Sequence, residues 1–325
     1  MSNQMKGAHV PGSQAGFSLV ELLISMAIFL VISGAVTQAL MQMTNSQRTI
    51  WNRTQMHSGV RSATELLQQE VGQAGRISLP YLTTLGDAVI ADPAAAQTVG
   101  VNQVINTATV ASVSGTFVGE QLTIGAGPSQ ETVTVTSVST DAKTISGVFT
   151  IAHAAGTPVM VLGAFASGLV PLAPGFPNGS SPNVLKLYGD INGDGNMVYV
   201  EYTCDTVAGR LYRNVMPYDA AAKVAPTSSQ ILLGNIRPNP DGTGCFTYEP
   251  NPLPVVNGST YVLDVAITLT AQTLMKDPIT NAFQTETKAL LNVSPRNVFN
   301  VWQLASVGVA NRVQPMPLTV RNLLP

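Results

Sequence analysis

The feature that most constrains the fold is a long stretch near the N-terminus that is almost free of charge. Between Lys6 and Arg48 the only formally charged residue is Glu21, and residues 17–43 read FSLVELLISMAIFLVISGAVTQALMQM. A helix rises about 1.5 Å per residue, so a helix of this length can cross the ~30 Å hydrocarbon core of a bilayer. We therefore predict a transmembrane helix over residues 17–43.

The charges that flank this helix predict its orientation in the membrane. Lys6 and the N-terminal amine precede the span, and positively charged flanks stay in the cytoplasm. The residues after Arg48 then lie outside the cytoplasm. A secretory signal peptide has a shorter apolar core followed by a small-residue cleavage site, and no convincing site follows here. The sequence therefore predicts a single-pass membrane anchor that is retained.

Beyond the span, apolar residues recur at helical spacing. Intervals of three and four residues separate Met56, Val60, Ala63, Leu67, Val71 and Ala74. Such a stripe occupies one face of a helix and is typical of packing on a globular core. Gly72 and Gly75 weaken the helix toward its end. We expect one continuous helix over residues 17–76, with its first half in the membrane and its second half packed on a sheet.

The rest of the chain lacks a long helical pattern and predicts short strands. From Leu79 onward Pro, Gly, Thr and Val dominate, which favours strands and loops. Residues 97–165 alternate apolar and polar positions between turns, as a small β-module would. We expect an α+β fold with a connector at 77–96, an inserted all-β module at 97–165, and a β-rich head at 166–325 built on an antiparallel sheet.

Composition excludes several classes of function. The chain has 16 Lys and Arg against 18 Asp and Glu, and charged residues make up 10% of it, which does not suit a nucleic-acid binder. Three His and two Cys lie far apart, and the nucleotide-binding and hydrolase motifs are missing. His153 stands alone in the module and is expected to be structural. The sequence predicts a protein that is not an enzyme and that has no certain cofactor.

The residues around the start of the span form a specific motif. Gly16 is followed by Phe17, Ser18, Leu19, Val20 and Glu21. This resembles the processing site of type IV prepilins, in which a peptidase cuts after the Gly and methylates the new N-terminal residue. The resemblance implies a leader peptide at 1–16, an N-methylated Phe17 in the mature chain, and prepilin peptidase as a partner.

Glu21 is unusual because a carboxylate inside a membrane span is costly, about 2.5–3.5 kcal/mol for Asp at a helix centre. The resemblance implies that Glu21 pairs with the N-terminal amine of a neighbouring pilin in the filament, which would compensate its burial. The alternative is that Glu21 lies at the cytoplasmic interface and reaches the headgroups there. Other pilins and the inner membrane are the partners that the resemblance implies, and the extracellular pilus is the location after assembly.

Two further segments narrow the resemblance. ELLQQEVGQAGRI at the helix end and EYTCDTVAGRLYRN in the head resemble the PilW/PulJ class of minor pilins and type II secretion pseudopilins. The class implies a lollipop, with a long N-terminal helix packed on an antiparallel β head. We expect a non-enzymatic minor pilin that takes part in pilus assembly. A type II secretion pseudopilin is one alternative, and a membrane-anchored surface-binding or enzymatic protein is another.

Cys204 and Cys245 both fall in the segment expected outside the cytoplasm. Disulfides form and persist in oxidising compartments, so these two residues are expected to pair. Two free thiols are the alternative.

An acidic loop leaves two interpretations open. Asp190, Asn192, Asp194 and Glu201 fit the calcium-loop pattern D-x-[DN]-x-[DN]-G-x5-E. The residues before Glu201 alternate as a strand, which at ~3.3 Å per residue carries Glu201 away from the loop. One interpretation is a hairpin turn rich in Asp, Asn and Gly. The other is a calcium site formed by Asp190, Asn192 and Asp194 with a ligand from elsewhere. A glycosidase carboxylate pair is a third reading, which lacks any sign of a sugar cleft.

Overall fold

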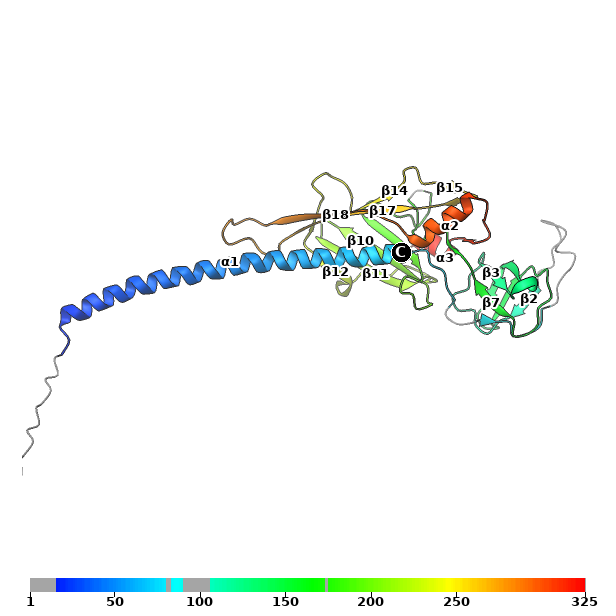
Figure 1. Ribbon diagram of the computed structural model, residues 1–325, viewed down its shortest axis with the longest axis horizontal. Helices are drawn as coiled ribbons and strands as arrows, with labels where there is room; N and C mark the ends of the chain where they lie inside the picture. The colour runs from blue at the N-terminus through cyan, green and yellow to red at the C-terminus, as the bar shows by residue number, and fades with distance from the viewer. Residues whose placement is uncertain (1–15, 80–82, 90–105, 173–174, 325) are drawn as a thin grey trace, which may run out of the picture.

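The computed structural model of the chain describes residues 16–79, 83–89, 106–172 and 175–324. A single long helix, α1 (Leu19–Gln73), leads into a head that is built mainly of antiparallel strands (Figure 1). This arrangement confirms the α+β fold and the long N-terminal helix expected from the sequence. Residues 1–15 of the expected leader, and residues 90–105 at the connector and the start of the expected module, lie outside the described residues.

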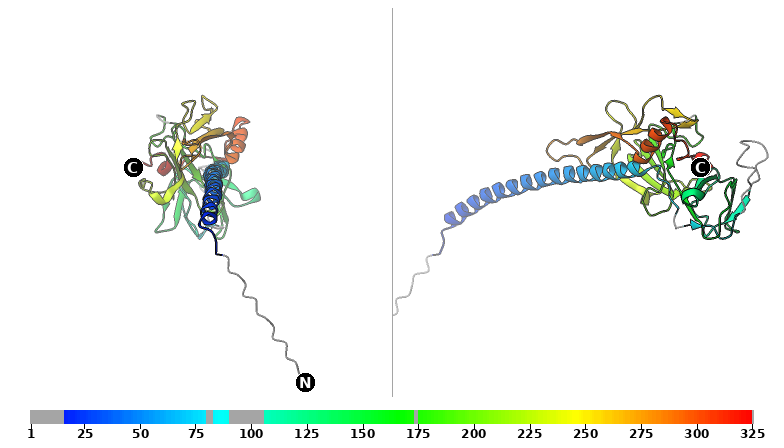
Figure 2. Two further views of the ribbon diagram at one scale, coloured as in Figure 1. Left: turned by 90° about the vertical axis from the view of Figure 1, so that its left-hand side faces the viewer. Right: turned by 45° about the vertical axis from the view of Figure 1, so that its right-hand side comes forward.

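The head covers only the second half of α1. Between residues 19 and 55, all of which the structure describes, no side chain is buried. Beyond this point a stripe of α1 side chains packs into the head, and it consists of Met56, Val60, Ala63, Thr64, Leu67, Glu70 and Val71. The predicted apolar stripe is therefore the packed face. The right-hand view of Figure 2 also shows that the first half of α1 projects well beyond the head.

Two antiparallel sheets form the head around this packed half of the helix. The first sheet has the order β12-β11-β10-β9. Its strands are β9 (Val184–Gly189), β10 (Val198–Asp205), β11 (Arg210–Pro217) and β12 (Ile231–Gly234). The second sheet has the order β13-β17-β14, with β18 also paired to β17. Its strands are β13 (Ile236–Arg237), β14 (Phe246–Glu249), β17 (Asp264–Gln272) and β18 (Thr285–Val293). Side chains from both sheets and from α1 share one hydrophobic core.

Smaller elements close the head. The short strands β8 and β19 pair in parallel, and β15 pairs with β16. Their bounds are β8 (Ala164–Phe165), β15 (Val255–Val256), β16 (Ser259–Thr260) and β19 (Val313–Gln314). The helices of the head are α2 (Arg296–Ser306), α3 (Leu318–Arg321) and the short 3-10 helix η2 (Ser228–Gln230), whereas a second 3-10 helix, η1 (Gly127–Ser129), belongs to the β-module described next. In α2, Val298 packs against the end of α1.

A separate β-module lies at the end of the molecule away from the start of α1 (Figure 1). One of its sheets has the order β1-β7-β3-β4 and the other has the order β2-β6-β5. The strands are β1 (Thr83–Thr84), β2 (Asn106–Thr109), β3 (Gln121–Ile124), β4 (Glu131–Thr134), β5 (Ser137–Ser139), β6 (Thr144–Gly147) and β7 (Pro158–Val161). The module has its own hydrophobic core, which includes Leu85 and Val89, whereas Phe165 packs with the head. The division into a connector at 77–96 and a module at 97–165 stays a proposal.

Three glycines let the end of α1 cross the head at backbone contact. Gly75 follows the helix with a φ of +80°, and its N–H donates to the Tyr188 carbonyl at 3.0 Å. A Cβ at Gly168 would lie 2.5 Å from the Gly75 nitrogen, and a Cβ at Gly189 would lie 2.6 Å from the Arg76 carbonyl oxygen. No larger residue fits such distances, so these glycines fix where the helix meets β9.

Candidate functional site

The described residues that precede α1, 16–18, are exposed. Gly16 has no other atom within 4 Å of the position that a Cβ would take, and the Phe17 side chain is 88% exposed. Ser18 is the N-cap of the helix and has an extended backbone. The bond between Gly16 and Phe17 is therefore accessible to another protein, as the predicted processing step requires.

Glu21 lies in the first turn of α1 and is exposed. Its Oε2 accepts a hydrogen bond from the Ser18 backbone N–H at 3.1 Å, which is half of a capping box. A carboxylate in the first turn also interacts favourably with the helix dipole. The chain supplies Glu21 with this one backbone donor among the described residues, which leaves its second oxygen available to a group from another molecule.

The part of α1 up to Met43 is predominantly apolar and exposed. Among the described residues, α1 is the one helix long and apolar enough to cross a membrane. Its exposed large side chains include Leu22, Ile24, Phe29, Leu30, Val31, Ile32 and Val36. A surface of this kind is unfavourable in water and suits lipid or the apolar faces of other helices.

A buried carboxylate joins α1 to the first sheet. Glu70 is 4% exposed and accepts hydrogen bonds from the Tyr202 hydroxyl at 2.6 Å and from Arg213 Nε at 3.0 Å. A second nitrogen of Arg213 also contacts Glu70, so the pair is bidentate. Burial, together with the Glu70 charge, raises the pKa of the Tyr202 hydroxyl, which therefore stays protonated as a donor.

This contact connects the two segments that resemble the PilW/PulJ class. Glu70 lies in ELLQQEVGQAGRI, and Tyr202 and Arg213 lie in EYTCDTVAGRLYRN. Sequence analysis did not assign these residues a role. The signal available was a Glu beside Leu67 and Val71 on the apolar stripe, since a carboxylate on a buried helix face needs a partner.

The two cysteines are disulfide-bonded, as the sequence predicted. Cys204 lies on β10 of the first sheet, and Cys245 immediately precedes β14 of the second sheet. Both belong to the core that the two sheets share with α1. The bond closes a sequence separation of 41 residues. In the chain-entropy description, closing a loop of this size stabilises the folded state by about 4 kcal/mol.

The acidic loop uses its first carboxylate for contacts within the protein. Asp190 is fully buried, and its oxygens accept hydrogen bonds from Ser78 Oγ at 2.6 Å and from the Asp194 N–H at 3.0 Å. Arg76 Nε lies 3.5 Å from the same carboxylate. The guanidinium competes with any cation at this position, and Asn192 and Asp194 are exposed. Asp190 thus shapes the loop, and calcium binding stays a prediction.

Glu201 lies away from that loop. It accepts hydrogen bonds from the Tyr199 hydroxyl and from Lys223 Nζ, both at 2.7 Å. This placement agrees with the expectation that the strand carries Glu201 beyond the reach of an ion at Asp190. Among the described residues, no three His, Cys, Asp or Glu side chains gather in a way that could hold a metal.

His153 is buried in the module and pairs with Glu131. Its Nε2 lies 2.7 Å from Glu131 Oε1, and the other Glu131 oxygen accepts from the Thr150 N–H at 2.7 Å and from its hydroxyl at 2.6 Å. The pair holds the loop after β6 against β4. It is a structural contact of the kind the sequence suggested.

Comparison with known proteins bears on the N-terminal segment. A family model described as the prokaryotic N-terminal methylation motif matches residues 12–37, which include Gly16, Phe17 and Glu21. No curated protein and no solved structure matches the chain. The motif supports a type IV pilin-like or pseudopilin precursor. Together with the apolar helix that follows Gly16, it fits membrane anchoring.

Proposed function

We propose that this protein is a non-enzymatic minor pilin, anchored in the inner membrane by the first half of α1, with its head outside the cytoplasm. The observation that carries the proposal is the uncovered apolar part of α1, which begins at Leu19 within the methylation motif of residues 12–37 and carries Glu21 in its first turn. In water such a helix would expose a large apolar surface. In a pilin the same surface contacts lipid while the subunit is in the membrane and contacts the helices of other subunits in the filament.

In this proposal residues 1–16 are a leader that prepilin peptidase removes. The peptidase hydrolyses the bond between Gly16 and Phe17 and then methylates the new amine. The exposure of both residues supports access by the peptidase. Glu21 then pairs with the amine of a neighbouring pilin. Its Oε2 accepts from the Ser18 N–H, and its other carboxylate oxygen is available to accept from this amine.

The N-terminal mass of the protein extracted from membranes tests the processing step. We expect a mature chain that begins at N-methylated Phe17, and a full-length precursor in Gly16→Val. Gly12→Val, a matched change in the same leader, is expected to leave cleavage intact. If Met1 is retained in wild-type cells that have the peptidase, the pilin proposal fails.

The same anchor, processing site and head suit a type II secretion pseudopilin. Deletion of the gene separates the two roles, because loss of surface pili with normal secretion supports the minor pilin. Loss of exoprotein secretion with normal pili supports the pseudopilin.

Calcium binding at Asp190, Asn192 and Asp194 is a separate prediction. If the loop binds calcium, millimolar calcium should raise the melting temperature, and Asp194→Ala should abolish the rise. Equal melting temperatures with and without calcium would leave the loop as an ordinary turn.

A further inference from the structure

The hairpin formed by β17 and β18 lies along α1 and is held there by a polar stripe. Thr49, Arg53 and His57 are spaced four residues apart on α1, and they contact Asp277, Gln284 and Glu286 respectively. Gln284 Nε2 also donates to Asp277 Oδ2 at 2.7 Å. Asp277 is 4% exposed and accepts from the N–H groups of Ile279 and Thr280. The loop between the strands is therefore fixed against the helix.

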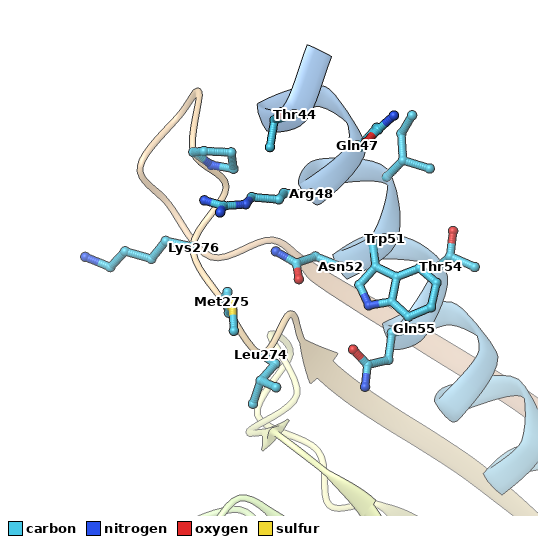
Figure 3. Close-up of a pocket in the computed structure, with 12 residues that line it drawn as sticks. Thr44, Gln47, Arg48, Trp51, Asn52, Thr54, Gln55, Leu274, Met275 and Lys276 are labelled. Carbon is cyan, nitrogen blue, oxygen red and sulfur yellow. The ribbon is translucent and has the colours of Figure 1, made fainter. Parts of the chain in front are cut away.

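This loop and the helix beside it expose a cluster of apolar side chains. On the loop, Leu274 is 58% exposed, Met275 63% and Ile279 68%. On the helix, Ile50 and Trp51 are also mostly exposed. One groove is lined by Thr44, Arg48 and Trp51 of α1 and by Leu274, Met275 and Lys276 of the loop. Figure 3 shows the Arg48 side chain pointing toward the loop and the Lys276 side chain pointing away from the helix. Fixed apolar side chains of this number, gathered at one end of the head, indicate a surface that another molecule covers.

The groove lies where α1 leaves the proposed membrane span. Thr44 directly follows the span of residues 17–43, and it lines the groove together with Pro278 of the loop. Arg48 is four residues further along, about 6 Å at the rise of a helix. Each headgroup region of a bilayer is roughly 5–8 Å thick. The end of the loop therefore reaches the level of the headgroups on the side of the head.

The charges of this surface favour anionic headgroups over another apolar helix. Arg48 and Lys276 contribute two positive charges to the lining of the groove, whereas Arg53 and the buried Asp277 belong to the polar stripe that holds the loop; the whole chain has a net charge of −2. Lys276 Nζ also lies 5.8 Å from the ring centre of Phe283. The span of a second copy would bring only Glu21 as a charge, which is too few charges to neutralise both Arg48 and Lys276. Trp, Lys and Arg are the side chains that membrane interfaces favour.

We propose that the β17–β18 loop and the facing side of α1 form a second membrane contact, which binds anionic phospholipid headgroups of the leaflet on the side of the head. The inference rests on the insertion of α1 that the proposed function includes. While the subunit is in the membrane, the contact restricts the tilt and rotation of the head above the bilayer. The contact is lost when the subunit leaves the membrane and enters a filament. Lys276 pairs with the headgroups while Met275 and Ile279 enter the boundary with the acyl chains.

Site-specific fluorescence on the full chain in vesicles tests this contact. Both cysteines of the chain are disulfide-bonded, so an added cysteine can be labelled alone. A polarity-sensitive fluorophore on Ile279→Cys is compared with the same label on Val307→Cys, which is exposed after α2 at the other end of the head. A label on Val36→Cys in the span reports insertion of α1. The vesicles contain phosphatidylcholine alone or with phosphatidylglycerol.

We expect the Ile279 label to shift to shorter wavelength with phosphatidylglycerol, and less so without it, while the Val307 label does not change. High salt and Lys276→Glu should each reduce the shift, because both weaken the attraction to anionic lipid. Lys288→Glu, an exposed charge further along β18, should leave the shift unchanged.

A water-like Ile279 label beside a shifted Val36 label overturns the second contact and leaves the proposed function standing. A Val36 label without a shift overturns both, because α1 is then not inserted. A shift that depends on the ratio of protein to lipid, and not on lipid charge, assigns the groove to a second copy of the chain and overturns the proposal.

Discussion

Glu70 determines how α1 is rotated against the head. It lies on the packed face of the helix, where the adjacent stripe residues are apolar, and it meets Arg213 of β11 and Tyr202 of β10. A rotation of the helix would move this carboxylate away from both donors and into the apolar core. Because unpaired buried charges are costly, the contact specifies one orientation of the helix.

Glu70→Ala is expected to lower the free energy of unfolding by about 3–5 kcal/mol, since it leaves the half-buried Arg213 without its partner. Tyr202→Phe should cost less, about 1–2 kcal/mol, because it removes one hydrogen bond. Thermal unfolding of the full chain in detergent measures both. Glu65→Ala, which removes an exposed ion pair with Arg61 on the same helix, is the control and should not shift the melting temperature measurably. Equal effects of Glu70→Ala and Glu65→Ala would contradict the role of Glu70.

Glu120 is a buried carboxyl group at the joint between module and head, and we expect it to make stability depend on pH. It precedes β3, next to the contact in which the Gln121 N–H donates to Gln314 Oε1 at 2.9 Å. Burial raises the pKa of Glu120 to about 8, although the Phe117 N–H donates to its Oε2. Its Oε1 is buried and has no partner among the described residues.

The folded protein therefore holds the Glu120 proton more tightly than the unfolded chain. The contribution of Glu120 to the free energy of unfolding is at its full value below about pH 4.5. It falls by up to about 1.4 kcal/mol per pH unit as the pH rises toward 8. Glu120→Gln should flatten the dependence of the melting temperature between pH 5 and pH 8 and raise it at pH 8. Glu65→Gln, at an exposed position, should keep the slope of the wild type. The assignment fails if Glu120→Gln retains that slope.

At the scale of elements, the end of α1 is fixed by the crossing of Gly75 with Gly168. The two backbones approach so closely that a Cβ on Gly168 would lie within 2.6 Å of both the nitrogen and the Cα of Gly75. The same crossing places the Phe165 N–H on the Gly75 carbonyl at 2.9 Å. Helix, β8 and β9 therefore meet at one point, from which the chain continues into the module.

Gly168→Ala is expected to cost about 3 kcal/mol or more, because it adds a clash with backbone to the strain of a left-handed residue. Gly242→Ala is the matched control. Gly242 has a similar φ of +76° but open space around it, so its loss should be limited to about 1–2 kcal/mol. The difference between the two variants in free energy of unfolding, measured with denaturant, gives the energetic cost of the clash at the crossing of Gly75 with Gly168. Equal losses of unfolding free energy in the two variants would mean that the backbone around Gly168 can shift to accommodate the added methyl group.

The elements that the sequence predicted are those with a local signal. The apolar stripe from Met56 to Val71 follows helical spacing and is the buried face of α1. The cysteine pair followed from the compartment expected for the head. Both patterns can be recognised without knowing which segments meet in space.

The contacts that the sequence did not predict join segments far apart in the chain. Tyr202 and Arg213 lie 132 and 143 residues beyond Glu70, and no local pattern indicates such pairings. The acidic loop gives the same lesson. Its residue pattern matches a calcium loop, but the Asp190 carboxylate accepts a hydrogen bond from Ser78, which lies 112 residues earlier in the chain. A sequence motif shows which possible metal ligands are present. The fold determines which of them are already bound to other residues of the protein and which can still bind an ion.

The whole molecule divides into a part that the head stabilises and a part that it leaves uncovered. The buried half of α1 is held by the core, by Glu70 and by the glycine crossing. The first half, with Glu21 near its start, has no such contacts with the part of the head that the structure describes. In the proposed filament we therefore expect assembly to depend on the uncovered half, with the head and module on the outside.

Glu21→Ala tests that dependence on the uncovered half. The variant should insert and be cut after Gly16, because the span becomes more apolar and the cleavage site is unchanged. It should join other pilins poorly, because the amine of a neighbouring subunit loses the carboxylate that would neutralise it inside an apolar helix bundle. Co-purification with other minor pilins and counts of surface pili measure assembly, and the N-terminal mass measures cutting.

Glu65→Ala removes an exposed carboxylate from the head half of the same helix, and it should assemble as the wild type does. Glu21→Gln keeps the size and the polar oxygen of the side chain but not its charge. If charge pairing with the amine drives docking, Glu21→Gln should fail as Glu21→Ala does. Wild-type piliation in Glu21→Ala would show instead that Glu21 is an interfacial residue, whose carboxylate reaches the cytoplasmic headgroups and has no part in docking.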